Sequence, residues 1–85
     1  MYYIEVTRQA EKDMRLIERS KLKDKAAELL NIIHENPYQN PPPYEKLRGS
    51  DNRYSRRINE QHRLVYEING GTIKILRMWT HYERI

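Results

Sequence analysis

The sequence of 85 residues contains no cysteine and no phenylalanine, and only three glycines. Without cysteine the chain can form no disulfide, no thiolate metal site and no cysteine nucleophile. The scarcity of glycine also leaves no glycine-rich loop of the kind that binds phosphates. No apolar run approaches the roughly 20 residues that cross a bilayer, and the first residues lack the apolar stretch of a signal peptide. We therefore expect one small domain, residues 1–85, that is soluble and lies in the cytoplasm.

Charged residues, in contrast, make up 33% of the chain, with a net charge of +4. Residues 1–36 hold seven basic and seven acidic residues, whereas residues 37–85 hold nine and five, so the whole excess lies in the second half. Most of it comes from six cations: Lys46, Arg48, Arg53, Arg56, Arg57 and Arg63. Arginine is suited to a bidentate contact with phosphate. A solvated basic pair of strands would explain the pattern equally well, but a polyanion site, with nucleic acid as the partner, is the more specific hypothesis.

The first half of the sequence predicts one strand and two helices. Residues 2–6 are rich in aromatic and β-branched residues, which favours a short strand. Thr7 can cap a first helix with apolar residues at helical spacing, and Ser20 can cap a second, which ends before Pro37. The apolar stripe of the second helix is Leu22, Ala26, Leu29, Leu30 and Ile33.

The second half predicts a proline-rich loop and then strands. Residues 37–44 contain all four prolines, which excludes a helix and favours an extended loop. Asn69-Gly70-Gly71 is a strong hairpin signal between the last two strands. The four strand-like segments are residues 44–48, 53–59, 63–68 and 72–79. The order β-α-α-β-β-β-β predicts an α+β fold, in which an N-terminal strand and a two-helix hairpin pack on a twisted, mainly antiparallel sheet.

The residue types near the basic segment are sufficient for one reaction, the cleavage of RNA without a metal. The three histidines lack ligand spacing, so we expect no metal site. The ribose 2′-hydroxyl can attack its own phosphate, so the protein needs only a base, an acid and cations for the charge that builds on the phosphate. His81 is a candidate acid because imidazole titrates near neutral pH, although a lone histidine is more often a surface residue.

Three other candidates each have a structural alternative. Glu45 adjoins the basic segment, where it could equally form a surface ion pair. Arg63 begins the most apolar predicted strand, an awkward place for a charge that has neither a function nor a partner. Tyr82 could stack on a base or fill the edge of the core. His62, by strand alternation, lies on an apolar face and is predicted to be structural.

The geometry of the hairpin decides whether Arg63 and His81 can share a site. A two-residue turn at Gly70-Gly71 would put them on opposite faces of the sheet. A three-residue turn over residues 69–71, with a bulged glycine, would put them on the same face. A shared site therefore predicts the bulged turn, or a bend in the chain beyond Trp79.

Residues 54–68 read YSRRINEQHRLVYEI, with PPPYEKLRG before them and IKILRMWTHYE after them. This segment resembles the Txe/YoeB toxins of the RelE superfamily over about residues 37–83. The resemblance implies a RelE-like fold and the toxin of a type II toxin–antitoxin pair. Such a toxin is an mRNA endoribonuclease that acts in the ribosomal A site with no metal or other cofactor. The partners that it implies are a Phd/YefM-like antitoxin and the ribosome with its mRNA, with a homodimer left open and no membrane.

The resemblance also implies roles for six residues, carried over by position. Glu45 in YEKL would be the general base, Arg63 in HRLVY would stabilise the scissile phosphate, and His81 in the HY pair would be the general acid. The residues that would hold the RNA backbone or pack against the displaced base are Arg48, Arg57 and Tyr82.

Two other classes of function use the same scaffold. One is a ParE-like inhibitor that acts on DNA gyrase without catalysis, and the His81-Tyr82 pair argues against it because a pure binder needs no acid there. The other is a plain module that binds RNA or DNA. Strongly salt-dependent binding with no shortened product would indicate the second.

Overall fold

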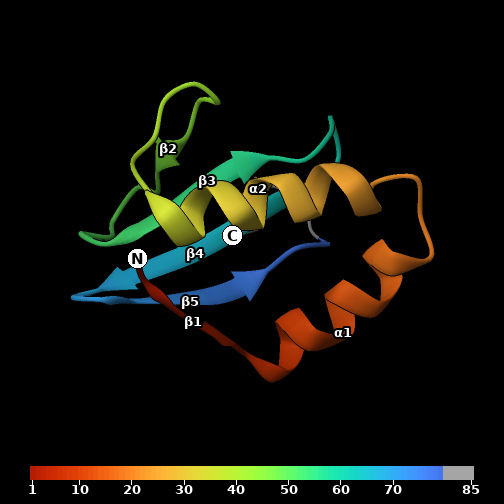
Figure 1. Cartoon of the computed structure of the whole chain (residues 1–85), viewed down its shortest axis with the longest axis horizontal. Coiled ribbons are helices and arrows are strands. Elements are labelled where there is room, and N and C mark those ends of the chain that lie inside the picture. Colours follow the sequence, from red (N-terminus) through yellow and green to blue (C-terminus); the bar gives the residue numbers. More distant parts are fainter. Residues whose placement is uncertain (80–85) are drawn as a thin grey trace.

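The computed structural model describes residues 1–79 of the chain (Figure 1). The elements are β1 (Tyr3–Val6), α1 (Arg8–Glu18), α2 (Lys23–Glu35), β2 (Glu45–Lys46), β3 (Arg53–Arg57), β4 (Arg63–Asn69) and β5 (Thr72–Arg77). Their order is the predicted one, which confirms the α+β fold, although β2 is shorter than the strand expected there. Within this part of the chain, no helix has both the length and the apolar character needed to cross a membrane.

The strands form one five-stranded sheet in the order β1-β5-β4-β3-β2. β1 runs parallel to β5, and the other neighbours are antiparallel, so the sheet is mainly antiparallel as predicted. Figure 1 shows α2 lying across β3 and β4, and α1 beside β1 and β5. Buried side chains of both helices and of one sheet face form a common core, so the helices cover that face. The other face is left for the candidate site.

The central strand β4 is buried on both of its faces. Leu64, Tyr66 and Ile68 alternate toward the helices and belong to the core. Arg63 and Val65 point to the opposite face and are buried as well. A charged side chain is therefore buried at the start of the central strand, on the face that the helices do not cover.

The two predicted helix caps have different outcomes. Thr7 caps α1, because its hydroxyl accepts a hydrogen bond from the backbone N–H of Ala10 at 3.0 Å. The prediction that Ser20 caps α2 was wrong, since α2 begins at Lys23 and Ser20 lies in the connection before it. There the Ser20 hydroxyl accepts from the N–H of Leu22 and donates to the C=O of Ile17, which closes the turn between the helices.

Arg56 fixes the proline-rich loop, residues 37–44, to the sheet. Its side chain is 1% exposed, and its Nε donates to the Tyr66 hydroxyl at 3.1 Å. Its terminal nitrogens donate to three loop carbonyls, those of Pro37, Gln39 and Pro42. Because proline has no N–H, the loop cannot bond these carbonyls to itself as a helix or hairpin would. Counting Arg56 with the cations of a polyanion site was therefore wrong.

Of the two turns considered for the β4–β5 hairpin, the chain has the two-residue turn at Gly70-Gly71, with Asn69 opposite Thr72. Gly70 has a φ of 57°, in the left-handed region that glycine occupies without strain. The register instead shifts farther along, because Tyr66 lies opposite Ile75 while Val65 lies opposite Arg77.

Leu76 is thus an extra residue in β5, and the one-residue slip changes the face to which Arg77 points. The pairing of β4 with β5 therefore changes face within the strands instead of in the turn. His81 lies outside the described residues, so its sharing a site with Arg63 stays a prediction.

Candidate functional site

The sheet face opposite the helices holds a cavity of about 200 Å³. Pairing across the strands explains why its residues meet: Glu45 lies opposite Ser55, and Arg57 opposite Arg63. Paired residues of neighbouring strands project to the same face. The lining residues are Pro43, Tyr44, Glu45, Ser55, Arg57 and Arg63. Three of the residues predicted for the site therefore lie around one cavity.

Glu45 and Arg63 form an ion pair across the cavity. Nη2 of Arg63 donates to Oε1 of Glu45 at 2.8 Å, and Nη1 lies 3.4 Å from the same oxygen. The arginine side chain is only 6% exposed, whereas the glutamate side chain is 53% exposed. The pair thus has a desolvated cation at the base of the cavity and a carboxylate in reach of solvent at its mouth. Arg63 has the partner that its apolar strand led us to expect.

The sequence analysis missed three cavity residues, Pro43, Tyr44 and Ser55, of which Ser55 contacts Arg63. Ser55 is fully buried in β3, and its hydroxyl accepts from Nη1 of Arg63 at 3.4 Å. Together with Glu45 it fixes the direction of the Arg63 guanidinium. Strand alternation could have found it, because Ser55 precedes Arg57 by two residues and so shares its face.

The two arginines predicted to hold the RNA backbone lie in different places. Arg57 is exposed at the end of β3 and lines the cavity, where it adds a second guanidinium beside Arg63. Arg48 is exposed in the turn that follows β2, where Gly49 has a φ of 79°. Arg48 does not line the cavity.

A cluster of tyrosine rings connects the cavity residue Tyr44 to the core. Tyr44, which lines the cavity, meets the Tyr54 ring edge to face, with centroids 5.8 Å apart. The Arg56 guanidinium lies 4.9 Å from the centroid of the Tyr44 ring. Tyr54 in turn stacks on Tyr66, and burial raises the pKa of the Tyr66 phenol, which stays neutral and donates to the C=O of Pro37 at 3.0 Å. These contacts hold the residue before Glu45 in a fixed position.

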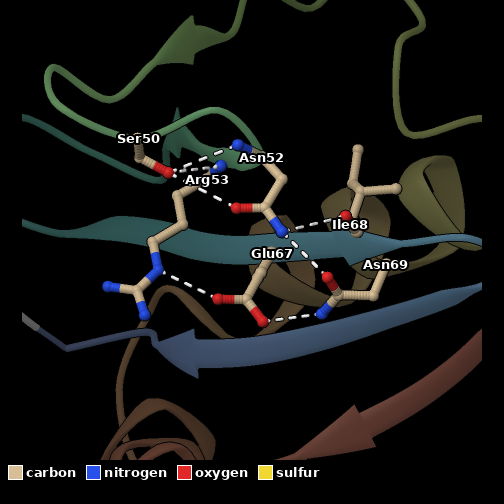
Figure 2. Close-up of polar contacts among 6 residues, drawn as sticks. All are labelled: Ser50, Asn52, Arg53, Glu67, Ile68 and Asn69. Carbon is tan, nitrogen blue, oxygen red and sulfur yellow. Dashed lines mark hydrogen bonds and ion pairs between the residues drawn. The ribbon is translucent and has the colours of Figure 1, made fainter.

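Arg53 serves the fold instead of the cavity. Its Nε donates to Oε2 of Glu67 at 3.0 Å, and its backbone N–H donates to the Ser50 hydroxyl (Figure 2). Asn52 bonds the C=O of Ile68 and the side chain of Asn69, which donates to Oε1 of Glu67 at 2.7 Å. Hydrogen bonds from Asn69 and Arg53 hold the pKa of Glu67 below its ordinary value. This network binds the turn before β3 to β4.

The chain after β5 passes close to the start of β4. The Trp79 ring stacks on the His62 ring, with centroids 3.9 Å apart and planes at 21°. His62 is buried, which agrees with the structural role predicted for it, and it directly precedes Arg63. His81 and Tyr82, the predicted acid and stacking residue, lie outside the described residues.

The described part of the chain contains one more buried carboxylate, that of Asp13 in α1. Its Oδ2 accepts from Nε of Arg77 and from the backbone N–H of Met78, both at 2.9 Å. The sequence analysis missed this link. The available signal was an acidic residue within the apolar stripe of a helix, three residues after Ala10 and four before Ile17.

The fold of the chain is similar to the folds of two solved toxins. The YoeB/ParE toxin from Agrobacterium tumefaciens superposes with a TM-score of 0.82 at 24% identity, over 94% of this chain and 99% of that one. A chain of the Escherichia coli DinJ-YafQ toxin-antitoxin complex superposes with a TM-score of 0.82 at 23% identity, over 96% of this chain and 94% of that one. At these identities the likeness is one of fold.

The family follows from the sequence itself. The model of the YoeB-like toxins of bacterial type II toxin-antitoxin systems matches residues 7–82, and the chain belongs to this family. The YoeB of the Staphylococcus aureus YoeB dimer is 33% identical, with a TM-score of 0.80 over 95% of this chain and 98% of that one. No curated protein matches the chain significantly. These matches confirm the resemblance to the Txe/YoeB toxins that the sequence shows.

Proposed function

We propose that this toxin is an endoribonuclease that cleaves mRNA in the ribosomal A site by acid–base chemistry between its own side chains. The observation that carries the proposal is the cavity in which the half-exposed Glu45 carboxylate meets the buried Arg63 guanidinium at 2.8 Å. A base in reach of solvent and a desolvated cation beside it are what attack on a phosphate by a neighbouring hydroxyl requires.

The reaction uses the ribose of the substrate as the nucleophile. Glu45 bonds Arg63 through Oε1, so its Oε2 can take the proton from the 2′-hydroxyl as the 2′-oxygen attacks the adjacent phosphorus. Arg63 and Arg57 stabilise the negative charge that builds on the phosphate oxygens. His81 donates a proton to the departing 5′-oxygen. The bond from phosphorus to the 5′-oxygen breaks, which leaves a 2′,3′-cyclic phosphate and a 5′-hydroxyl.

The substrate is held along the exposed cations of the same face. Arg57 contacts a phosphate at the cavity, Arg48 contacts the RNA backbone farther along, and Tyr82 packs against the displaced base. Support comes from the basic charge, because Arg57 and Arg48 are both exposed whereas Arg56 and Arg63 are buried.

Replacing Arg57 with alanine is expected to weaken the binding of single-stranded RNA about equally for all sequences. Loss of one phosphate contact should lower the slope of log K against log salt by about 0.7 to 1. The measurement is a titration with a fluorescent RNA oligonucleotide at several salt concentrations. Arg53→Ala is the matched control, because Arg53 lies in the same strand but is bonded to Glu67. An equal change of slope in both variants would contradict the assignment of Arg57.

The partners are proposed from the solved relatives. The YoeB of Staphylococcus aureus has been solved as a YoeB-YefM complex, and that YoeB is 34% identical to this chain over 96% of its length. By analogy, we expect this toxin to be neutralised by a Phd/YefM-like antitoxin and to be able to form a homodimer. Since its substrate is on the ribosome, it acts in the cytoplasm.

Induction of the wild-type toxin in bacterial cells is expected to arrest translation, and Glu45→Ala and His81→Ala are expected to relieve the arrest. Loss of a positioned base or acid should lower the rate by about 10²-fold. The measurements are incorporation of a labelled amino acid and mapping of the 5′ ends of the message, at matched protein levels. Equal arrest by all three proteins would rule out this chemistry. Damaged DNA with intact message would instead indicate the ParE-like alternative.

A further inference from the structure

β5 extends past the strand that pairs with its outer edge. β1 pairs with β5 only as far as Val6, which lies opposite Ile75, and the N–H of Thr7 then donates to the C=O of Ile75. Beyond this point the chain turns into α1, which lies beside the end of β5 (Figure 1). The backbone groups on this outer edge of β5 from Leu76 onward therefore need partners other than β1.

Two side chains supply these partners, one from the N-cap of α1 and one from the middle of that helix. The Thr7 hydroxyl donates to the C=O of Leu76 at 3.2 Å, at the residue where the register shifts. Asp13 accepts from the N–H of Met78 and from Nε of Arg77, each at 2.9 Å. The helix thus fixes the backbone of β5 at the bulge and two residues beyond it.

The Asp13 carboxylate is only 1% exposed and yet charged. A charged carboxylate is well suited to accept these hydrogen bonds. Burial alone would raise the pKa of Asp13, but the hydrogen bonds from Arg77, the Met78 backbone and Gln9 outweigh burial and hold that pKa below its ordinary value. Gln9 donates to the other carboxylate oxygen at 3.1 Å. The three donors fix the orientation of the carboxylate. The carboxylate in turn fixes the position of the Met78 backbone.

We propose that Asp13 is a positioning residue for the reaction: with Thr7 it fixes the bulge and the end of β5, and through them it serves the role proposed for His81, which follows in the chain. The inference rests on the proposed function, since it takes His81 as the acid. The bulge exchanges the faces of the strand, and a loosened bulge would no longer fix the face on which the chain leaves β5. A small displacement of the general acid lowers kcat more than it weakens substrate binding.

Asp13→Ala is expected to lower kcat for cleavage of ribosome-bound mRNA by about 10²-fold, with KM within about threefold of the wild type. Asp13→Asn is expected to keep kcat within about threefold, because its amide oxygen can still accept from the N–H of Met78. A kcat for Asp13→Ala close to the wild-type value would overturn the proposal. So would an equal loss in the alanine and asparagine variants.

Ile33→Val is the matched control for loss of stability. Ile33 is fully buried in α2, so the substitution weakens the core without removing a hydrogen bond of Thr7 or Asp13 to β5. Rates are compared per folded molecule, with the folded fraction taken from urea unfolding of each variant. We expect the wild-type kcat for Ile33→Val, and a loss there as large as that of Asp13→Ala would mean that Asp13 acts through stability alone.

A second readout separates this inference from the proposed function. In the free toxin, the ring signals of His81 in NMR spectra are expected to move in Asp13→Ala and to stay in place in Ile33→Val. If the wild-type toxin failed to cleave any message, the proposed function would fall, while a moved His81 signal would still support the positioning by Asp13. An unmoved signal in Asp13→Ala would overturn the positioning whether or not the toxin cleaves.

Discussion

Replacing Arg63 with leucine is expected to slow cleavage of ribosome-bound mRNA by about 10³-fold and to leave the free energy of unfolding nearly unchanged. The loss follows from the proposed role of the guanidinium, which stabilises charge on the phosphate in a site shielded from water. An arginine that stabilises the transition state of phosphoryl transfer contributes about 10³ to 10⁵ in turnover. Single-turnover cleavage and urea unfolding of the same preparations measure the two quantities.

The stability of the Arg63→Leu variant follows from the asymmetry of the ion pair. The Arg63 side chain is 6% exposed and the Glu45 side chain 53%, so removing the cation leaves a carboxylate that water can solvate. Leucine meanwhile places an apolar group beside the buried Val65 and Ser55. Replacing a buried ionic group with an apolar one of similar size is often neutral or stabilising.

Arg53→Leu is the control for the same chemical change on the same sheet. Arg53 is exposed and bonded to Glu67, so its loss should lower the unfolding free energy by at most about 1 kcal/mol and leave cleavage at the wild-type rate. Cleavage by Arg63→Leu at more than a tenth of the wild-type rate would contradict the role of Arg63. Equal losses in both variants would show that net charge, and not the cavity, governs the reaction.

The order of elements could be predicted because each has a local signal. The apolar residues of α1 and α2 recur at helical spacing, and Gly70-Gly71 marks the β4–β5 turn. The prediction for Ser20 failed because a serine hydroxyl can either cap a helix or close a turn, and the sequence does not show which of the two it does. The bulge at Leu76 could not be predicted, because it depends on how Thr7 and Asp13 of a distant segment bond the strand.

The candidate site could be predicted in part, by alternation along strands. Arg57 and Arg63 are opposite each other across β3 and β4, and Glu45 reaches the same face from β2. What the charge count alone cannot give is the direction of each arginine. Arg56 and Arg57 are neighbours with the same side chain, and strand alternation sends one to the helix side and the other to the cavity. The charge count of the basic segment therefore overstates the number of cations available to RNA.

Arg56→Gln is expected to lower the free energy of unfolding by about 3 to 5 kcal/mol, a large part of the roughly 5 to 15 kcal/mol of an ordinary domain. The guanidinium is 1% exposed and bonds the Tyr66 hydroxyl and three carbonyls of the proline-rich loop. Glutamine cannot reach them all, and the unpaired carbonyls either stay buried or pull the loop away from the sheet.

Arg56→Gln should affect the candidate site as well as the stability of the fold. The loop leads into Tyr44, whose ring packs against the Arg56 guanidinium, and then into Glu45. We therefore expect the variant, measured at a temperature where it is folded, to cleave more slowly as well, because Glu45 loses its fixed position. Arg57→Gln makes the same change one residue away on the exposed side and should alter unfolding by less than about 0.5 kcal/mol. Equal unfolding curves for the two variants would show that the loop is held by its tyrosine contacts, and that Arg56 is not its anchor.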